Sequence, residues 1–345
     1  MLAGSFAAPW QHKGGIMVTS RSARITGSLV TSMSLATALA STALAQDASP
    51  APLASGSPAT VVVTDNHGPI EVPVSPERLV ALDNTTFQTL SDWDVPVVAL
   101  PKQLMYSLWP DLTEDPAILD VGMHFEPDIE AIIEADPDLI IGGYRFSDLY
   151  DQLKAIQPAT IETTFREGED HMAELKRQVG ILGPIFAREA DAQALAEGLD
   201  AAVASARAAY NGTDTVMGLI TSADALAYAA PTTGRAIGPL FPALGLVPAI
   251  AQAGEDPTHG DDISVEAIAA ANPEWLIVLD RDAMFGEEGY VPARELIEGN
   301  EALQGVPAVQ KGQVIYLAPS FYLDEGIQAY TQLFTDVAEA FAAAR

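Results

Sequence analysis

The sequence predicts an α/β protein of two related lobes, each with a central, mostly parallel sheet, joined by one long rigid helix. Three observations lead to this prediction. Strand-like runs alternate with helical patterns along most of the chain, one helix-turn-strand pattern occurs twice, and a glycine-poor stretch of helix-forming residues separates the two copies. Strands that alternate with helices lie parallel, because each helix returns the chain to the same edge of the sheet.

The first segment, residues 1–45, has the features of a secretory signal peptide. Arg21 and Arg24 precede a short apolar stretch that ends in Ala-Leu-Ala at residue 45. A positive start, an apolar region and a small-residue cleavage site are typical of such a signal. We expect cleavage before Gln46 and take Met17 as the true start. A membrane anchor is the alternative, but the apolar run is shorter than the ~20 residues that a spanning helix needs.

The composition restricts the class of protein. The chain has 345 residues, a formal net charge of −30 and no cysteine. The lack of cysteine excludes disulfides, thiolate metal sites and a lipid-anchored N-terminal cysteine. The acid excess disfavours nucleic acid and anionic membranes, because both would be repelled. With the export signal, these features predict a periplasmic protein without a lipid anchor, and we expect a monomer that binds no nucleic acid.

The rest of the chain divides into a linker and three structural segments. Residues 46–58 are rich in Pro, Ala and Ser and are expected to be a disordered linker. We assign residues 59–183 to an N-terminal α/β lobe, 184–210 to the linking helix and 211–345 to a C-terminal α/β lobe. Near the start of the first lobe, the Asp-Asn-His-Gly sequence of residues 65–68 predicts a hairpin turn.

An internal repeat indicates that the two lobes are related. Residues 128–141 and 264–277 each form a short amphipathic pattern, an Asp-Pro or Asn-Pro turn and a buried strand pattern. In both copies a glutamate precedes the proline by seven residues and an arginine follows it by eight. These pairs are Glu130 and Glu266, and Arg145 and Arg281.

The linking helix is predicted from residues 184–210. Pro184 opens the stretch, Asn211-Gly212 closes it, and Gly198 is its one internal glycine. At about 1.5 Å per residue the helix would reach ~40 Å, enough to brace two lobes. An ordinary surface helix within one lobe is the alternative.

Several fragments, in their order and spacing, resemble one known family. They are residues 78–83 (RLVALD), 137–141 (PDLII), Arg145 with 150–151 (YD), 234–235 (GR), 258–260 (THG), 279–281 (LDR), and 316–319 (YLAP) with 322–323 (YL). The chain resembles the helix-linked periplasmic binding proteins of iron-siderophore and cobalamin import, and most of all the ferric catecholate branch. This resemblance implies a shallow cleft between the lobes, no enzymatic activity, and an ABC permease with its ATPase as partners.

Three arginines are the predicted anion-binding groups. Ligands in α/β lobes bind beyond the carboxyl ends of the strands, so Arg145 and Arg281 should face one mouth. Arg235 lies in a Thr-Thr-Gly-Arg turn where the resemblance places a cleft arginine. Guanidinium groups suit a negatively charged catecholate complex, because they donate several hydrogen bonds and stack on aromatic rings. Surface salt bridges are the alternative for each. Lys102 is a further candidate contact.

His259 and Tyr322 are the predicted iron donors. The resemblance implies that both ligate the ferric iron when the siderophore supplies only four oxygens. Fe³⁺ is a hard cation that favours phenolate oxygen, and imidazole is an accepted iron ligand. The iron would arrive with the siderophore, so no intrinsic cofactor is expected. The segment around Tyr322 is one residue shorter than the family pattern, which leaves open whether Phe321 faces the ligand. Ordinary packing is the alternative for the tyrosine, and a polar surface position for the histidine.

Glu130 and Glu266 are the predicted docking residues. The resemblance implies that one glutamate from each lobe pairs with arginines of the permease. Stabilisation of a helix N-terminus, worth ~0.3–1 kcal/mol, is the alternative and is compatible with docking.

Other functions remain as alternatives. Another iron chelate, haem or cobalamin would suit the same fold, and a hexadentate siderophore would leave Tyr322 and His259 as outer contacts. An exported hydrolase is the different class, but the chain has no Gly-x-Ser-x-Gly or His-Glu-x-x-His motif. Direct binding of free metal is disfavoured because the five histidines form no cluster in the sequence.

Overall fold

The computed structural model describes residues 59–105, 108–223, 225–286 and 289–345. The predicted signal peptide (1–45) and linker (46–58) lie outside the described residues. Within the part that is described, no helix combines the length and the apolar character needed to cross a membrane.

The N-terminal lobe is built on a five-stranded sheet in the order β5-β4-β3-β8-β9. All neighbouring strands are parallel. The strands are β3 (Leu79–Ala81), β4 (Val97–Leu100), β5 (Leu119–Asp120), β8 (Leu139–Gly142) and β9 (Thr160–Glu162). Short helices connect them: η1 (Asn84–Thr86), α1 (Phe87–Asp92), α2 (Lys102–Met105), α3 (Pro110–Thr113), α4 (Ile129–Glu134), η2 (Tyr144–Leu149) and α5 (Tyr150–Ile156).

Two small hairpins accompany this sheet. Strands β1 (Thr60–Asp65) and β2 (Gly68–Pro73) pair antiparallel, with Asp65 opposite Gly68. The hairpin turn predicted at residues 65–68 is therefore confirmed. Strands β6 (Gly122–Met123) and β7 (Glu126–Pro127) form the second hairpin directly before α4.

The C-terminal lobe contains a six-stranded sheet in the order β13-β11-β10-β14-β15, with β12 also paired to β10. Its strands are β10 (Thr215–Ser222), β11 (Ala225–Ala229), β12 (Val247–Pro248), β13 (Asp261–Asp262), β14 (Trp275–Leu279) and β15 (Val314–Leu317). The pairs formed by β10, β12, β14 and β15 are parallel, whereas β11 pairs antiparallel with β10 and β13. Its helices are α8 (Leu240–Leu244), α9 (Val265–Ala271), η3 (Asp282–Met284), α10 (Ala293–Glu298), η4 (Glu301–Leu303), α11 (Pro307–Gln310), η5 (Pro319–Tyr322) and α12 (Ile327–Ala343). The fold is thus α/β with mostly parallel sheets, as the sequence predicts.

The internal repeat is confirmed in three dimensions. Helix α4 leads into β8 and helix α9 leads into β14, and each helix is capped by the residue before it. Asp136 and Asn272, at matching positions, both adopt the left-handed conformation, with φ of 45° and 52°. Asp and Asn tolerate this conformation better than other residues with a β-carbon. The Asp-Pro and Asn-Pro pairs therefore end both helices in the same way.

The helix that joins the lobes begins later than predicted. Helix α6 (His171–Ile185) contains Pro184, and α7 (Glu189–Ala209) is a separate helix. Ala187, with φ of 53°, lies in the reversal between them. The prediction of one helix over residues 184–210, opened by Pro184, is therefore wrong at its start.

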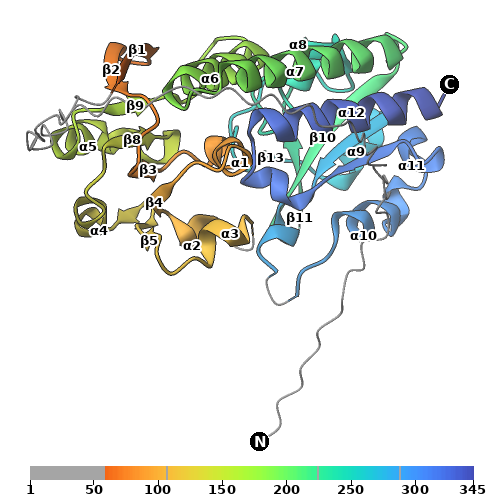
Figure 1. Ribbon diagram of the computed structural model, residues 1–345. Helices are drawn as coiled ribbons and strands as arrows, with labels where there is room; N and C mark the ends of the chain where they lie inside the picture. The colour runs from red at the N-terminus through yellow and green to blue at the C-terminus, as the bar shows by residue number, and fades with distance from the viewer. Residues whose placement is uncertain (1–58, 106–107, 224, 287–288) are drawn as a thin grey trace, which may run out of the picture. The chain divides into compact units, whose positions relative to one another are not determined.

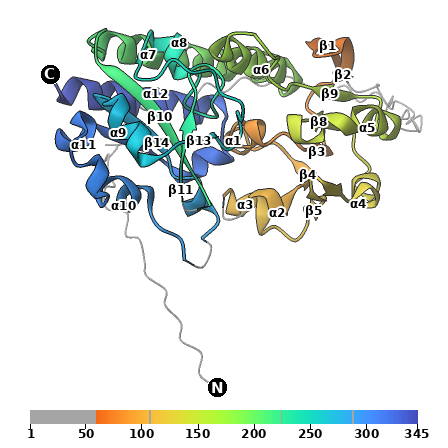
Figure 2. The same ribbon diagram turned by 180° about the vertical axis from the view of Figure 1, so that it is seen from behind.

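Helix α7 contacts both lobes. At its N-terminal end, Arg188 donates a hydrogen bond to the carbonyl of Trp93 beside α1. Near its C-terminal end, Arg207 donates to the carbonyl of Ala243 in α8. Figures 1 and 2 show α12 lying alongside α7, and Tyr210 packs on Phe341 there. The helix that links the lobes is therefore anchored at both ends.

Candidate functional site

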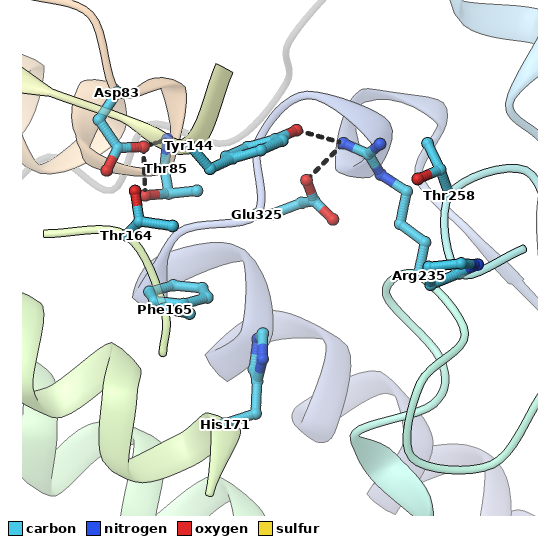
Figure 3. Close-up of a pocket in the computed structure, with 10 residues that line it drawn as sticks. Asp83, Thr85, Tyr144, Thr164, Phe165, His171, Arg235, Thr258 and Glu325 are labelled. Atoms are coloured by element: carbon cyan, nitrogen blue, oxygen red, sulfur yellow. Dashed lines mark hydrogen bonds and ion pairs between the residues drawn. The ribbon is translucent and has the colours of Figure 1, made fainter. Parts of the chain in front are cut away.

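A cavity of about 280 Å³ lies between the two lobes (Figure 3). The N-terminal lobe and the adjoining α6 supply Asp83, Thr85, Tyr144, Thr164, Phe165 and His171, and the C-terminal lobe supplies Arg235, Pro257, Thr258 and Glu325. The wall is mixed in character, with aromatic rings, hydroxyl groups and charges. A site of this kind can bind a ligand that carries both rings and charge.

Arg235 is the central cation of this cavity. One nitrogen, Nη2, donates to the hydroxyl of Tyr144 at 3.1 Å, to the carbonyl of Tyr322 at 2.8 Å and to the Glu325 carboxylate at 2.5 Å. Figure 3 shows the guanidinium group pointing from the C-terminal lobe toward Tyr144 and Glu325. The side chains of Arg235 and Glu325 are 8% and 13% exposed. Buried charges of this kind hold their geometry, because losing a partner is costly.

Tyr322 joins Arg235 to Arg281. The guanidinium carbon of Arg235 lies 4.0 Å from the centre of the Tyr322 ring, and that of Arg281 lies 4.9 Å from the same ring. Phe285 packs edge-on against Tyr322 and lies 4.7 Å from the guanidinium carbon of Arg281. Cation–π contacts of this type fix the two guanidinium groups around one phenol.

Arg145 reaches the same group of side chains through Tyr144. Its guanidinium carbon lies 5.0 Å from the centre of the Tyr144 ring, whose hydroxyl accepts from Arg235. The three predicted arginines therefore form a chain with two tyrosines, in the order Arg145, Tyr144, Arg235, Tyr322 and Arg281. Topology explains this arrangement, because Tyr144 and Arg145 follow β8 and Arg281 follows β14 at the carboxyl ends of the strands.

The positions of Tyr144 and Arg145 depend on a close approach between the backbone at Gly143 and Asp83. Gly143 connects β8 to η2, and a β-carbon at this position would lie 2.5 Å from the Cα of Asp83. Only glycine allows the chain to pass this close to the end of β3.

Several donor atoms of these arginines are buried without a hydrogen-bond partner among the described protein atoms. They are Nε and Nη2 of Arg145, Nε of Arg235 and Nε of Arg281. Buried donors are normally paired, and leaving one unpaired costs ~1–3 kcal/mol. A negatively charged oxygen ligand would satisfy such donors with charge-assisted hydrogen bonds.

His124 lies beside Arg145, in the turn between β6 and β7. Burial and, to a smaller degree, the nearby Arg145 charge lower the pKa of His124. Its Nδ1 is buried and has no hydrogen-bond partner among the residues that the structure describes. His124 therefore belongs to the surroundings of Arg145.

His259 lies in a neighbouring cavity of about 400 Å³. Arg281, Asp282, Phe285 and Tyr290 also line this second cavity, together with Ser222 and Ala223. The Asp256 carboxylate accepts hydrogen bonds from the backbone N–H groups of Thr258 and His259, which orients the loop. The His259 side chain is 46% exposed. Arg281 and Phe285 line this second cavity and also contact the Tyr322 ring, although Tyr322 itself is a lining residue of neither cavity.

The structure distinguishes Phe321 from Tyr322. Phe321 packs on the buried Tyr330 and lines a different cavity, beside α12. Tyr322 instead contacts Arg235 and Arg281. Of the two neighbouring rings, Tyr322 is the one next to the arginines.

Lys102 lies apart from both cavities. Its ammonium group donates to the carbonyl of Asp115, in its own lobe, and it lines neither cavity. The proposed contact of Lys102 with ligand therefore finds no support in the geometry.

Glu130 and Glu266 occupy the first turns of α4 and α9. Both are exposed, and neither forms an ion pair with another described residue. The caps of their helices are other side chains, those of Asp128 and Ser264.

Three site residues were missed by sequence reasoning as contacts. Tyr144 precedes the predicted Arg145, and Glu325 follows Tyr322 closely, but neither belongs to a recognisable motif. Asp83 is the last residue of the 78–83 fragment and is wholly buried, and burial raises its pKa to about 6. It accepts hydrogen bonds from Thr85 and Gln178 at the edge of the first cavity. Its position at the carboxyl end of β3 is the signal that could have indicated it.

Aromatic side chains form another wall of the first cavity. His171 packs against Phe165 and Tyr330, with ring centres 4.8 Å and 4.7 Å apart. Burial lowers the pKa of His171 to about 4. The ring is therefore neutral at neutral pH and behaves as part of an aromatic surface.

Comparison with known proteins gives consistent matches. Residues 79–320 match the sequence pattern of a family described as periplasmic binding protein. The petrobactin-binding protein YclQ of Bacillus subtilis is 30% identical over 280 residues, covering 79% of this chain and 84% of that protein. The ferric-anguibactin-binding protein FatB of Vibrio anguillarum is 26% identical over 266 residues, covering 76% and 81% of the two chains.

Solved structures give the same result. The crystal structure of YclQ matches with a TM-score of 0.71 and 26% identity, covering 82% of this chain and 99% of that one. The periplasmic catecholate-siderophore binding protein VctP of Vibrio cholerae matches with a TM-score of 0.71 and 25% identity, covering 81% and 99%.

Proposed function

This chain belongs to the periplasmic binding protein family, and from that membership we propose that it captures a ferric siderophore and delivers it to an ABC importer. The proposed ligand is a catecholate complex, and a tetradentate siderophore suits the site. We propose that the protein acts as a monomer in the periplasm, after cleavage before Gln46. It would present the ligand to an inner-membrane permease and its ATPase without chemical change, so the protein is not an enzyme.

The observation that carries this proposal is a set of buried guanidinium nitrogens on Arg145, Arg235 and Arg281 that have no hydrogen-bond partner in the described part of the chain. They lie next to two tyrosines in an otherwise strongly acidic protein. Catecholate oxygens around Fe³⁺ carry negative charge, and catechol rings are flat. Guanidinium groups can both donate to such oxygens and stack on such rings.

We propose that His259 and Tyr322 complete the iron sphere. A tetradentate siderophore leaves two of six positions open, and a phenolate with an imidazole would fill them. The iron belongs to the ligand in this proposal.

The relatives support the ligand class. Two of them are named for binding petrobactin and ferric anguibactin, and one structural relative is named for catecholate siderophores.

A tryptophan fluorescence titration tests the proposal. Purified protein lacking residues 1–45 would be titrated with ferric tetradentate bis-catecholate, ferric hexadentate tris-catecholate, ferric citrate, haem and cobalamin. We expect saturable quenching by a ferric catecholate with a dissociation constant below about 1 μM, corresponding to binding stronger than about −8 kcal/mol. Iron-free ligand is the control and should bind more weakly. Quenching by haem or cobalamin alone would instead favour those alternatives.

A further inference from the structure

Glu325 places a negative charge inside the proposed anion site. It follows η5 and precedes α12, lines the first cavity, and lies 2.5 Å from Arg235 through its Oε2. Its side chain is only 13% exposed. The neighbouring Asp324 lines a different cavity, together with Phe321, Gln88 and Asp92. Two consecutive acids therefore face two different places, and only Glu325 faces the ligand.

The charges around the cavity nearly balance. Arg235 is paired with Glu325, and Arg281 is paired with Asp282 at 2.9 Å. Arg145 forms no ion pair among the described residues. Asp83 also lines the first cavity, and Arg281 and Asp282 line the adjoining second one. Three guanidinium groups thus face three carboxylates, the lining has little net charge, and an anion with several uncompensated charges would be repelled by Glu325.

The charge of a ferric catecholate depends on the number of catecholates. Two catecholate dianions around Fe³⁺ leave one negative charge, and three leave three. A lining with little net charge suits the first complex better than the second. We propose that Glu325 is a specificity residue, which selects ferric complexes of low negative charge by holding a carboxylate against Arg235 inside the ligand cavity. This inference deepens the proposed function and rests on it.

The test compares two ligands in wild type and variants. The ligands are the ferric tetradentate bis-catecholate, with one negative charge, and the ferric hexadentate tris-catecholate, with three. The measured quantity is the ratio of their dissociation constants, obtained by fluorescence quenching at low and at high salt. Differences in size between the ligands cancel when this ratio is compared between wild type and variant.

Glu325→Gln removes the charge and keeps the shape. We expect it to shift the ratio by about tenfold toward the more negative complex, and we expect salt to reduce the shift. Glu325→Asp keeps the charge and should leave the ratio near that of wild type. Asp324→Asn is the matched control, because it removes the same charge one residue away, and it should also leave the ratio unchanged.

The outcomes separate this inference from the proposed function. If both ligands bind and Glu325→Gln leaves the ratio unchanged, the inference is overturned and the proposed function stands. If wild type binds neither ferric complex, the proposed function fails and the inference fails with it. A wild-type preference for the triply charged complex would also overturn the inference, and that measurement does not depend on any variant folding.

Discussion

The Nη2 of Arg235 and the hydroxyl of Tyr144 lie 3.1 Å apart and belong to different lobes. Tyr144 begins the helical turn after β8, whereas Arg235 lies in a loop after β11. The same nitrogen also contacts Glu325 and the carbonyl of Tyr322. This hydrogen bond thus connects the two walls of the first cavity. Any opening or closing of the cavity must change the surroundings of Arg235.

Replacing Tyr144 with Phe tests this connection. The variant keeps the ring near Arg145 and removes the acceptor for Arg235. We expect affinity for a ferric bis-catecholate to fall about 3- to 10-fold, since one hydrogen bond contributes ~0.5–1.5 kcal/mol. The measurement is the quenching titration. Tyr316→Phe is the control, because its hydroxyl bonds Glu298 on the surface, away from the cavity. Equal affinity in the wild type and the Tyr144 variant would contradict a role for this bond in binding.

Replacing Tyr322 with Phe tests iron ligation. A phenolate bound to Fe³⁺ adds a ligand-to-metal charge-transfer contribution to the visible spectrum, which phenylalanine cannot supply. We expect the visible band of the ferric bis-catecholate complex to shift in this variant. The cation–π contacts with Arg235 and Arg281 should persist, because the ring remains.

Tyr290→Phe is the control for that spectrum. Tyr290 lines the second cavity, but its hydroxyl donates to Asp280 at 2.7 Å, and burial with this bond raises its pKa. Its phenol is therefore engaged elsewhere, and the variant should give the wild-type band. A wild-type band in Tyr322→Phe would remove Tyr322 from the iron.

The positions of Arg145 and Arg281 could be predicted from the sequence because topology determines them. Each follows a buried strand in a copy of the same repeat, and parallel strands end at a common edge. The helix caps and the Asp-Pro and Asn-Pro turns are local features as well. Such features depend on residues close in sequence, so a single sequence contains enough information to predict them.

Tyr144 and Glu325 could not be predicted in the same way. Their roles arise because Arg235, distant from both in the sequence, lies between them. No local pattern encodes a contact between lobes.

The predicted start of the linking helix was wrong for a related reason. Proline commonly opens helices, but Pro184 lies in the last turn of α6, and the packing of α6 on α7 decides where the chain reverses. At Gly183, a β-carbon would lie 3.0 Å from the Cβ of Ala192, so glycine permits this close packing.

The lowered pKa of Glu174 makes the stability of the folded protein depend on pH. Burial alone would raise the pKa of Glu174, but hydrogen bonds from Arg166 and Arg177 lower it to about 2. A carboxyl group whose pKa is lowered in the folded state stabilises that state above its unfolded pKa. This contribution is lost as the pH falls from about 4.5 toward 2.

Glu174→Gln should therefore reduce the free energy of unfolding at pH 7 by about 2 kcal/mol, allowing for solvent screening at the half-exposed Arg166. Urea unfolding at pH 7 and pH 3 measures the effect, and the difference from wild type should be smaller at pH 3. Glu339→Gln, at an exposed position on α12, should change stability little at either pH. A difference that stays constant with pH would show that the lost packing, rather than the charge, is responsible.

Replacing Glu130 and Glu266 should weaken transport without weakening ligand binding. Asp128 and Ser264 already cap α4 and α9, so the two exposed glutamates are not needed to satisfy the helix ends. Replacing both with Ala should cost each helix only ~0.3–1 kcal/mol through the dipole. We expect the double variant to bind the ferric complex with wild-type affinity and to support weaker uptake of radioactive iron in cells that carry the native permease. The matched control is Glu77→Ala with Glu295→Ala, which removes one exposed charge from each lobe, neither of them on α4 or α9. Equal uptake by the two double variants would rule out docking through Glu130 and Glu266, because an effect of net charge alone would be the same in both.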